Sequence, residues 1–114
     1  MGSLAGKKCS PCRAGAPPLP VDKVQSLLRD VPGWSVRGGL AIEREFVMKD
    51  FMAAVRLVNA VAETAEAEDH HPDIHLTGYR RLRIELSTHS VGGLSENDFI
   101  MAAKIEALPK ELKA

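Results

Sequence analysis

Residues 68–89 read EDHHPDIHLTGYRRLRIELSTH, and this stretch contains the strongest structural signals of the chain. Pro72 disfavours helical backbone at the residue before it, so a preceding helix is expected to end here and to leave His71 extended. The apolar residues that follow alternate with polar ones and predict a β-hairpin with one buried face: Ile74, Leu76, Leu82, Ile84 and Leu86. Gly78-Tyr79-Arg80 supplies the turn, and His89 falls just beyond the second strand.

A second hairpin is predicted upstream, from Trp34–Val36 and Leu40–Val47 with the turn signal Gly38-Gly39 between them. Leu40, Ile42 and Phe46 share one face of the longer strand. Arg44 interrupts that apolar face, so it either lies at the sheet margin with its head in water or is turned outward by a bulge.

Three helices are expected around these hairpins. Apolar residues at helical spacing from Val21 to Val31 predict a short one, which Pro32-Gly33 ends. Asp50–Glu68 forms the longest, with Asp50 as N-cap. Its predicted buried stripe is Phe51, Val55, Val58, Ala62 and Ala65, widened by Met52, Leu57 and Val61. Ser95-Glu96-Asn97-Asp98 fits a capping box and opens the last helix, which reaches Leu108.

This order of elements favours an α+β fold, α-β-β-α-β-β-α, in which a four-stranded antiparallel sheet carries three helices packed on one face. Residues 1–20 are rich in glycine and proline and are expected to form a flexible N-terminal tail. Residues 21–114 are then a single domain, which is an ordinary size for one core.

Composition limits the classes of function. Fifteen Lys and Arg balance fifteen Asp and Glu, which lacks the basic excess of a nucleic-acid binder. No apolar run approaches the roughly 20 residues of a membrane span. Two cysteines, Cys9 and Cys12, cannot form a disulfide framework, so the cytoplasm is the expected location, with the nucleus as an alternative. Their single C-x-x-C is a weak zinc or redox signal, and its role stays open.

The four histidines are the candidate chemical groups, because imidazole changes charge near neutral pH. Three of them lie at positions 70, 71 and 75, and His89 could return beside them at a strand end. His71 and His75 have H-x-x-x-H spacing, but on a strand such residues are about 13 Å apart, so no metal is expected. His75 alternates to the polar face and is expected to be a surface residue. Proton transfer is therefore the favoured chemistry.

The quoted motifs, together with the Gly33-Trp34 pair, Phe46, Lys49-Asp50-Phe51 and Gly93-Leu94-Ser95-Glu96-Asn97-Asp98, resemble the pterin-4a-carbinolamine dehydratases. The resemblance runs from about Val21 to about Leu108. It implies the fold described above, a homodimer or homotetramer, and removal of water from 4a-hydroxytetrahydrobiopterin to give quinonoid dihydrobiopterin. That reaction serves pterin recycling for aromatic amino-acid hydroxylases and needs no cofactor.

The resemblance also implies roles for individual residues. His70 and His89 are the expected acid–base pair, and His71 is expected to bind or position the pterin. Asp98 matches an aspartate near the family's site, and Glu66 is a candidate to orient His70 from about one turn earlier on the helix. The remaining candidates for binding or orienting the substrate lie in the quoted motifs: Asp69, Pro72 and Thr88.

An interaction module is the alternative function, since animal members of the family also act as dimerisation partners of a homeodomain transcription factor. Such a transcription-factor or hydroxylase partner could coexist with catalysis. The alanine-rich helix of residues 50–68 or an exposed sheet edge is the expected surface for self-association.

Overall fold

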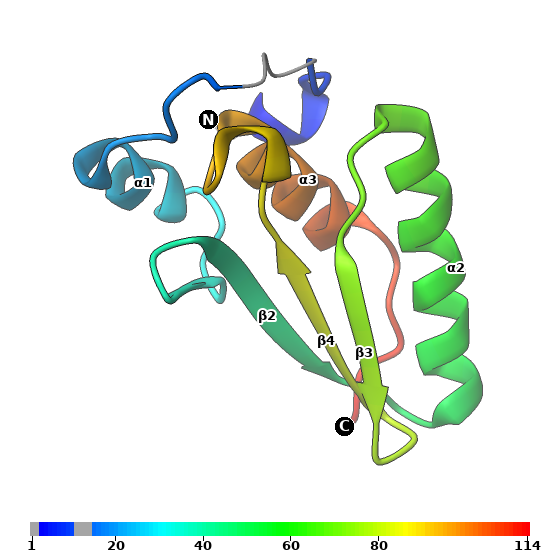
Figure 1. Ribbon diagram of the computed structural model, residues 1–114. Coiled ribbons are helices and arrows are strands. Elements are labelled where there is room, and N and C mark those ends of the chain that lie inside the picture. The colour runs from blue at the N-terminus through cyan, green and yellow to red at the C-terminus, as the bar shows by residue number, and fades with distance from the viewer. Residues whose placement is uncertain (1–2, 11–14) are drawn as a thin grey trace.

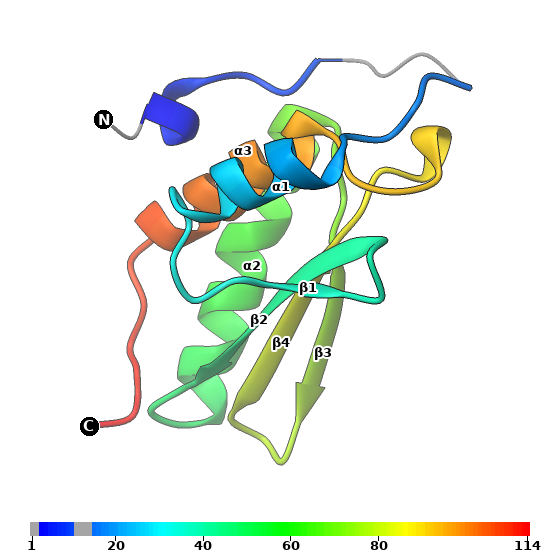
Figure 2. The ribbon, with the colours of Figure 1, turned by 90° about the vertical axis from the view of Figure 1, so that its left-hand side faces the viewer.

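The computed structural model describes residues 3–10 and 15–114. Four antiparallel strands form one sheet in the order β1-β2-β4-β3, and Figures 1 and 2 show the helices on one side of it. The strands are β1 (Ser35–Arg37), β2 (Ala41–Val47), β3 (Asp73–Thr77) and β4 (Arg81–Leu86). The α-helices are α1 (Val21–Leu28), α2 (Phe51–Glu68) and α3 (Glu96–Ala107), and two short 3-10 helices are η1 (Ser3–Gly6) and η2 (His89–Val91). The predicted fold class is confirmed.

The two hairpins form as the alternation predicts, and β2 pairs with β4 at the centre of the sheet. Their inward side chains are almost fully buried: Ile42, Phe46, Leu82, Ile84 and Leu86. Leu40, expected in the second strand, instead lies in the turn and is exposed, because Gly38 and Gly39 both have positive φ and the turn extends to it.

Helix α3 lies in the middle of the core and is buried around most of its circumference, including Phe99, Met101 and Ile105. Helix α2 buries a narrower stripe that contains Ala54, Leu57, Val61 and Ala65. The predicted stripe of α2 is therefore rotated by about one position, and Phe51 and Met52 at its start are exposed.

Arg44 corrects a second expectation. The ladder between β2 and β4 is regular at Arg44, so no bulge turns it outward, and its head does not lie in open water. The guanidinium packs over the Phe46 ring and donates to Glu106 at 2.8 Å, and Trp34 Nε1 donates to the same carboxylate at 2.9 Å. Gly33, with φ +98°, allows this approach, because a Cβ there would collide with the Arg44 guanidinium.

The N-terminal segment also differs from the expectation of a tail. Leu4 is buried in the core, and η1 packs against α3. After the undescribed residues, Leu19 N donates to Leu94 O at 2.9 Å. The described part of residues 1–20 therefore lies on the domain rather than apart from it.

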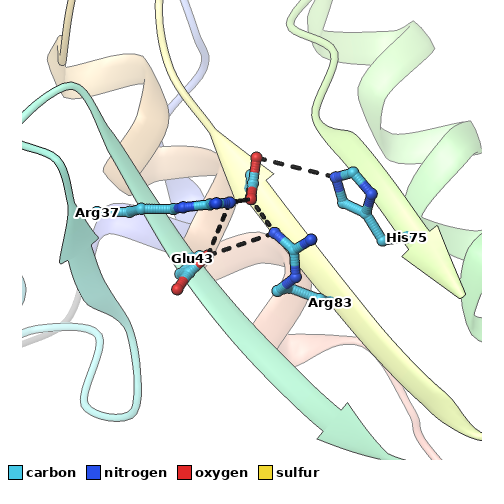
Figure 3. A network of polar contacts seen from close by, with 5 residues as sticks. Arg37, Glu43, His75 and Arg83 are labelled. Carbon is cyan, nitrogen blue, oxygen red and sulfur yellow. Dashed lines mark hydrogen bonds and ion pairs between the residues drawn. The ribbon is translucent and has the colours of Figure 1, made fainter. Parts of the chain in front are cut away.

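The outer face of the sheet is polar, as the alternation predicts. Figure 3 shows Arg37, Glu43, Arg83 and His75 around a central carboxylate, that of Glu85, which contacts both arginines. His75 Nε2 lies 3.8 Å from Glu85 Oε1. His75 is thus on the face opposite the helices.

Candidate active site

The candidate site is a pocket of about 510 Å³ where α2 ends, β4 ends and α3 begins. His70, His71 and His89 all line it. The structure therefore brings together three of the four histidines, and the hairpin β3-β4 brings His89 back to the start of the hairpin. His75 and Tyr79 do not line the pocket; Tyr79 sits in the turn at the far end of the hairpin.

The end of α2 determines where the adjacent histidines point. Asp69 caps the helix in the left-handed conformation, with φ 53° and ψ 43°, and His70 N donates to Ala65 O at 3.2 Å. A non-glycine residue in this region is uncommon, although aspartate tolerates it better than most, and such strain often lies near functional sites. The helix therefore ends at a left-handed turn three residues before Pro72, which corrects the expectation that proline itself ends it.

His70 is held from the opposite side of the pocket. Its Nε2 lies 2.7 Å from Asp98 Oδ1, with side-chain exposures of 11% for His70 and 0% for Asp98. The other carboxylate oxygen accepts from Thr88 Oγ1 at 2.8 Å and from Ser95 N at 2.9 Å. Because an ionised carboxylate only accepts, a hydrogen bond to ionised Asp98 requires the proton on His70 Nε2, and Nδ1 takes no part in this contact.

The carboxylate that was predicted to orient His70 contacts His71 instead. Glu66 Oε2 lies 2.6 Å from His71 Nε2, and both side chains are largely exposed. Glu66 was expected to orient His70, but the left-handed turn at Asp69 directs His70 toward α3 instead. Asp98, predicted only as a neighbour of the site, is the residue that orients His70.

His89 is exposed at the start of η2, three residues beyond the end of β4, as the sequence predicts. Thr88, just before it, is buried and pairs with Gly93 across the loop, so the backbone at this strand end is fixed. Pro72, another predicted residue, is half-buried between the pocket and β3 and is not among the pocket-lining residues.

Sequence reasoning missed a further part of the wall, formed by Cys9, Ser10, Glu68 and Asn97. Burial is the largest of the causes that raise the pKa of the Cys9 thiol to about 11, and the negative charge of Glu68 is the next. The thiol is therefore neutral at pH 7. The hydrogen bond donated by Cys9 N is the main cause that lowers the pKa of Glu68, and the positive charges of Lys104 and Lys8 lower it further. The available signal was the acidic end of α2, which opposes the helix dipole and predicts a local partner for Glu68.

Metal binding finds no support in the described part of the chain. Among residues 3–10 and 15–114, no group of three or more His, Cys, Asp or Glu side chains is arranged to hold a metal ion. Cys12, the second cysteine of the C-x-x-C pair, lies outside the described residues. Within the same residues, no helix combines the length and apolar character needed to cross a bilayer.

The structure thus combines an α+β domain with a pocket that His70, backed by the Asp98 carboxylate, lines together with His71 and His89. The model of the family Pterin 4 alpha carbinolamine dehydratase matches residues 17–108. The chain belongs to this family, whose named members are lyases.

Individual relatives agree with the family match. A protein of Nitrosospira multiformis, named as a pterin-4-alpha-carbinolamine dehydratase, is 47% identical over 105 residues, covering 92% of this chain and 91% of that one. Pterin-4-alpha-carbinolamine dehydratase 2 of Arabidopsis thaliana, a mitochondrial protein by name, is 41% identical over 97% of this chain and 62% of its own. A Brucella melitensis crystal structure, described as a transcriptional coactivator/pterin dehydratase, has TM-score 0.74 and 38% identity over 79% of this chain and 96% of that one.

Proposed function

We propose that this protein dehydrates 4a-hydroxytetrahydrobiopterin to quinonoid dihydrobiopterin by histidine acid–base catalysis, in the recycling of pterin for aromatic amino-acid hydroxylases. The observation that carries the proposal is the His70–Asp98 contact at 2.7 Å inside a pocket that His71 and His89 also line. The volume of about 510 Å³ falls in the range of small-molecule sites.

The reaction needs two proton transfers. The N5 lone pair forms the C4a=N5 double bond as the C4a–O bond breaks, one proton joins the departing hydroxyl to make water, and one leaves N5. Hydroxide is a poor leaving group, so a general acid is required, and each assisted transfer is worth roughly 10²–10⁴-fold in rate. We assign the two transfers to His70 and His89 as a pair.

Asp98 gives His70 a defined role within this pair. With Nε2 bound to the carboxylate, His70 exchanges its proton through Nδ1, and the carboxylate stabilises the imidazolium that appears during turnover. His71, which Glu66 holds at the pocket edge, positions the pterin. Asp69 acts indirectly, because it turns the chain after α2. Thr88 also acts indirectly, by donating a hydrogen bond to Asp98. Pro72 keeps the chain extended into β3.

The test is the rate at which purified protein dehydrates chemically generated 4a-hydroxytetrahydropterin. We expect His70→Ala and His89→Ala each to lower kcat by about 10²–10⁴-fold, and added imidazole to restore part of the activity of either variant. His75→Ala is the matched control, since His75 lies on the outer face of the sheet and outside the pocket. Full activity in both pocket variants would refute the proposal.

A second role as a protein partner is favoured by the description of the Brucella structure as a transcriptional coactivator. We propose that the chain forms a homodimer or homotetramer through α2 or a sheet edge, because Phe51 and Met52 are exposed at the start of α2. A transcription factor or a hydroxylase is the further partner, in the cytoplasm or the nucleus. A monomer by light scattering at micromolar concentration would contradict the assembly.

A further inference from the structure

An N-terminal arm, residues 3–10, is anchored to the domain although it precedes the region that the family model matches, residues 17–108. Leu4 is buried in the core, and Lys104 Nζ donates to Ala5 O at 2.8 Å. In Figure 1 the arm is the dark blue segment above α3, and in Figure 2 it crosses the top of the molecule above α3. The arm therefore has a fixed course up to Ser10.

Asn97, in the first turn of α3, clamps the far end of this arm. Its Oδ1 accepts from Ser10 N at 3.0 Å and its Nδ2 donates to Ser10 O at 2.6 Å, so the side-chain amide pairs with the arm as a neighbouring strand would. The Cys9 thiol donates to Asn97 O at 3.7 Å. Asn97 is buried, which favours these bonds because competing water is excluded.

Glu68 holds the arm from the other helix. Cys9 N donates to Glu68 Oε1 at 2.8 Å, and Lys104 Nζ lies 3.7 Å from Oε2. The Glu68 side chain is only 8% exposed. The arm thus connects the end of α2 to the start of α3, and these are the two elements that place His70 and Asp98.

The arm also reaches the pocket. Cys9 and Ser10 line it together with the three histidines. Asn97 is adjacent in sequence to Asp98, and Glu68 lies two residues before His70, so the arm and the catalytic pair share their supports. Small-molecule pockets commonly bury most of the ligand's surface, which requires walls on more than one side.

We propose that the N-terminal arm is a built wall of the pterin pocket and that Asn97 is the residue that positions it. This wall contributes to the affinity for the bicyclic pterin, while His70 and His89 set the rate of dehydration. The inference rests on the proposed function. A neutral Cys9 thiol fits this role, because an uncharged thiol does not compete with the histidines for protons.

The first experiment separates affinity from rate by steady-state kinetics. We expect Asn97→Ala to raise KM by about 10-fold and to change kcat by less than about 2-fold, because an interaction present in both ground and transition states affects binding alone. Asn59→Ala is the matched control: Asn59 is the only other asparagine of the chain and is exposed on α2. Unchanged KM in folded Asn97→Ala protein, or a fall in kcat at constant KM, would overturn the proposal.

The second experiment uses Cys9 as a reporter in a Cys12→Ser background, with alkylation by N-ethylmaleimide followed by mass spectrometry. Release of the arm should return the Cys9 pKa from about 11 toward its ordinary value of 9.0. The thiolate fraction then rises about 100-fold and its intrinsic reactivity falls about 10-fold, so Asn97→Ala should speed alkylation by about 10-fold. Saturating 7,8-dihydropterin should slow alkylation by at least about 5-fold when Asn97 is intact.

The two proposals can fail separately. Inactive His70→Ala and His89→Ala variants, with KM and Cys9 alkylation unaffected by Asn97→Ala or by dihydropterin, would reject the arm and keep the dehydratase. Dihydropterin that protects Cys9, in a protein without dehydratase activity, would keep the arm as a pterin-binding wall and reject the proposed reaction.

Discussion

Two adjacent histidines at the end of α2 each contact a carboxylate, at almost the same distance but in different surroundings. His70 Nε2 is 2.7 Å from Asp98, and His71 Nε2 is 2.6 Å from Glu66. The first pair is 11% and 0% exposed, and the second 55% and 77%. Water and salt screen the exposed pair far more than the buried one, so equal distances do not mean equal energies.

The buried pair differs also in its supports. Thr88 and Ser95 both donate to the second oxygen of Asp98, so the carboxylate that holds His70 is itself fixed. Glu66 lies on the exposed surface of α2. Within residues 3–10 and 15–114, no second donor to its carboxylate accompanies His71. We therefore propose that the His70–Asp98 pair fixes a ring for chemistry, whereas the His71–Glu66 pair adjusts a ring at the pocket edge.

The largest expected effect comes from Asp98→Asn, which keeps the shape of the side chain but gives it an amide. Ser95 N can only donate, so the amide oxygen must face it and the amide Nδ2 then faces His70 Nε2. Nδ2 cannot accept the proton on Nε2, so the ring turns or changes tautomer. We expect kcat to fall by about 10²–10³-fold and the free energy of unfolding to fall by about 2–4 kcal/mol. Initial rates measure kcat, and urea unfolding measures the free energy of unfolding. Near-normal kcat in the folded variant would remove the distinction between the pairs.

A smaller effect is expected from Thr88→Val, which removes the hydroxyl that donates to Asp98 Oδ2 and leaves the volume nearly unchanged. The hydroxyl also contacts Ser95 Oγ at 2.6 Å, and this contact is lost as well. The lost hydrogen bond to the buried charged group should cost about 1.5–3 kcal/mol of unfolding free energy, with a loss of kcat below about 10-fold. Thr88→Ser, which keeps the hydroxyl, is the control. A kcat loss as large as that of Asp98→Asn would give Thr88 a direct role in the chemistry.

Acid should weaken the arm through Glu68. The fold lowers the pKa of Glu68, so its stabilising contribution is complete above the unfolded value of about 4.5 and is lost as pH falls through the folded value. Glu68→Gln should therefore flatten the dependence of unfolding free energy on pH below about 4.5. An unchanged acid limb in urea titrations would show that the pairing of Cys9 N with Glu68 adds nothing to stability.

The smallest effect is expected from Glu66→Gln. Exposed ion pairs contribute about 0–1 kcal/mol, so unfolding free energy should hardly change, and KM should rise no more than about 3-fold while kcat stays constant. Added salt should reduce the KM difference, because it screens the exposed pair. A loss of kcat comparable to that of Asp98→Asn would show that burial does not separate the two histidines.

The sequence predicts the sheet well, because alternation in β2 and β4 records which side chains face the core. It predicts α2 less well, since alanine is tolerated on both faces of a helix and Phe51 and Met52 look buried from composition alone. Arg44 could not be placed from the strand pattern, because its partner Glu106 comes from α3 and depends on tertiary packing.

The sequence motifs predicted which histidines form the site, but not which carboxylate contacts each of them. His70, His71 and His89 were expected together, and the structure places them around one pocket. The exchange of Glu66 for Asp98 as partner of His70 depends on the left-handed backbone at Asp69, which no periodicity predicts. The packing of the arm could not be predicted for a related reason. Leu4 and Cys9 are isolated in a glycine- and proline-rich stretch, and their burial depends on α3.

A double-mutant cycle on kcat tests most directly whether His70 acts through Asp98. His70→Ala, Asp98→Asn and the double variant are compared with the unchanged protein in the dehydration of 4a-hydroxytetrahydropterin. If Asp98 works by holding His70, the double variant should have the kcat of His70→Ala within about 3-fold. Two losses that multiply in the double variant would show that the buried pair is not the unit that moves the proton.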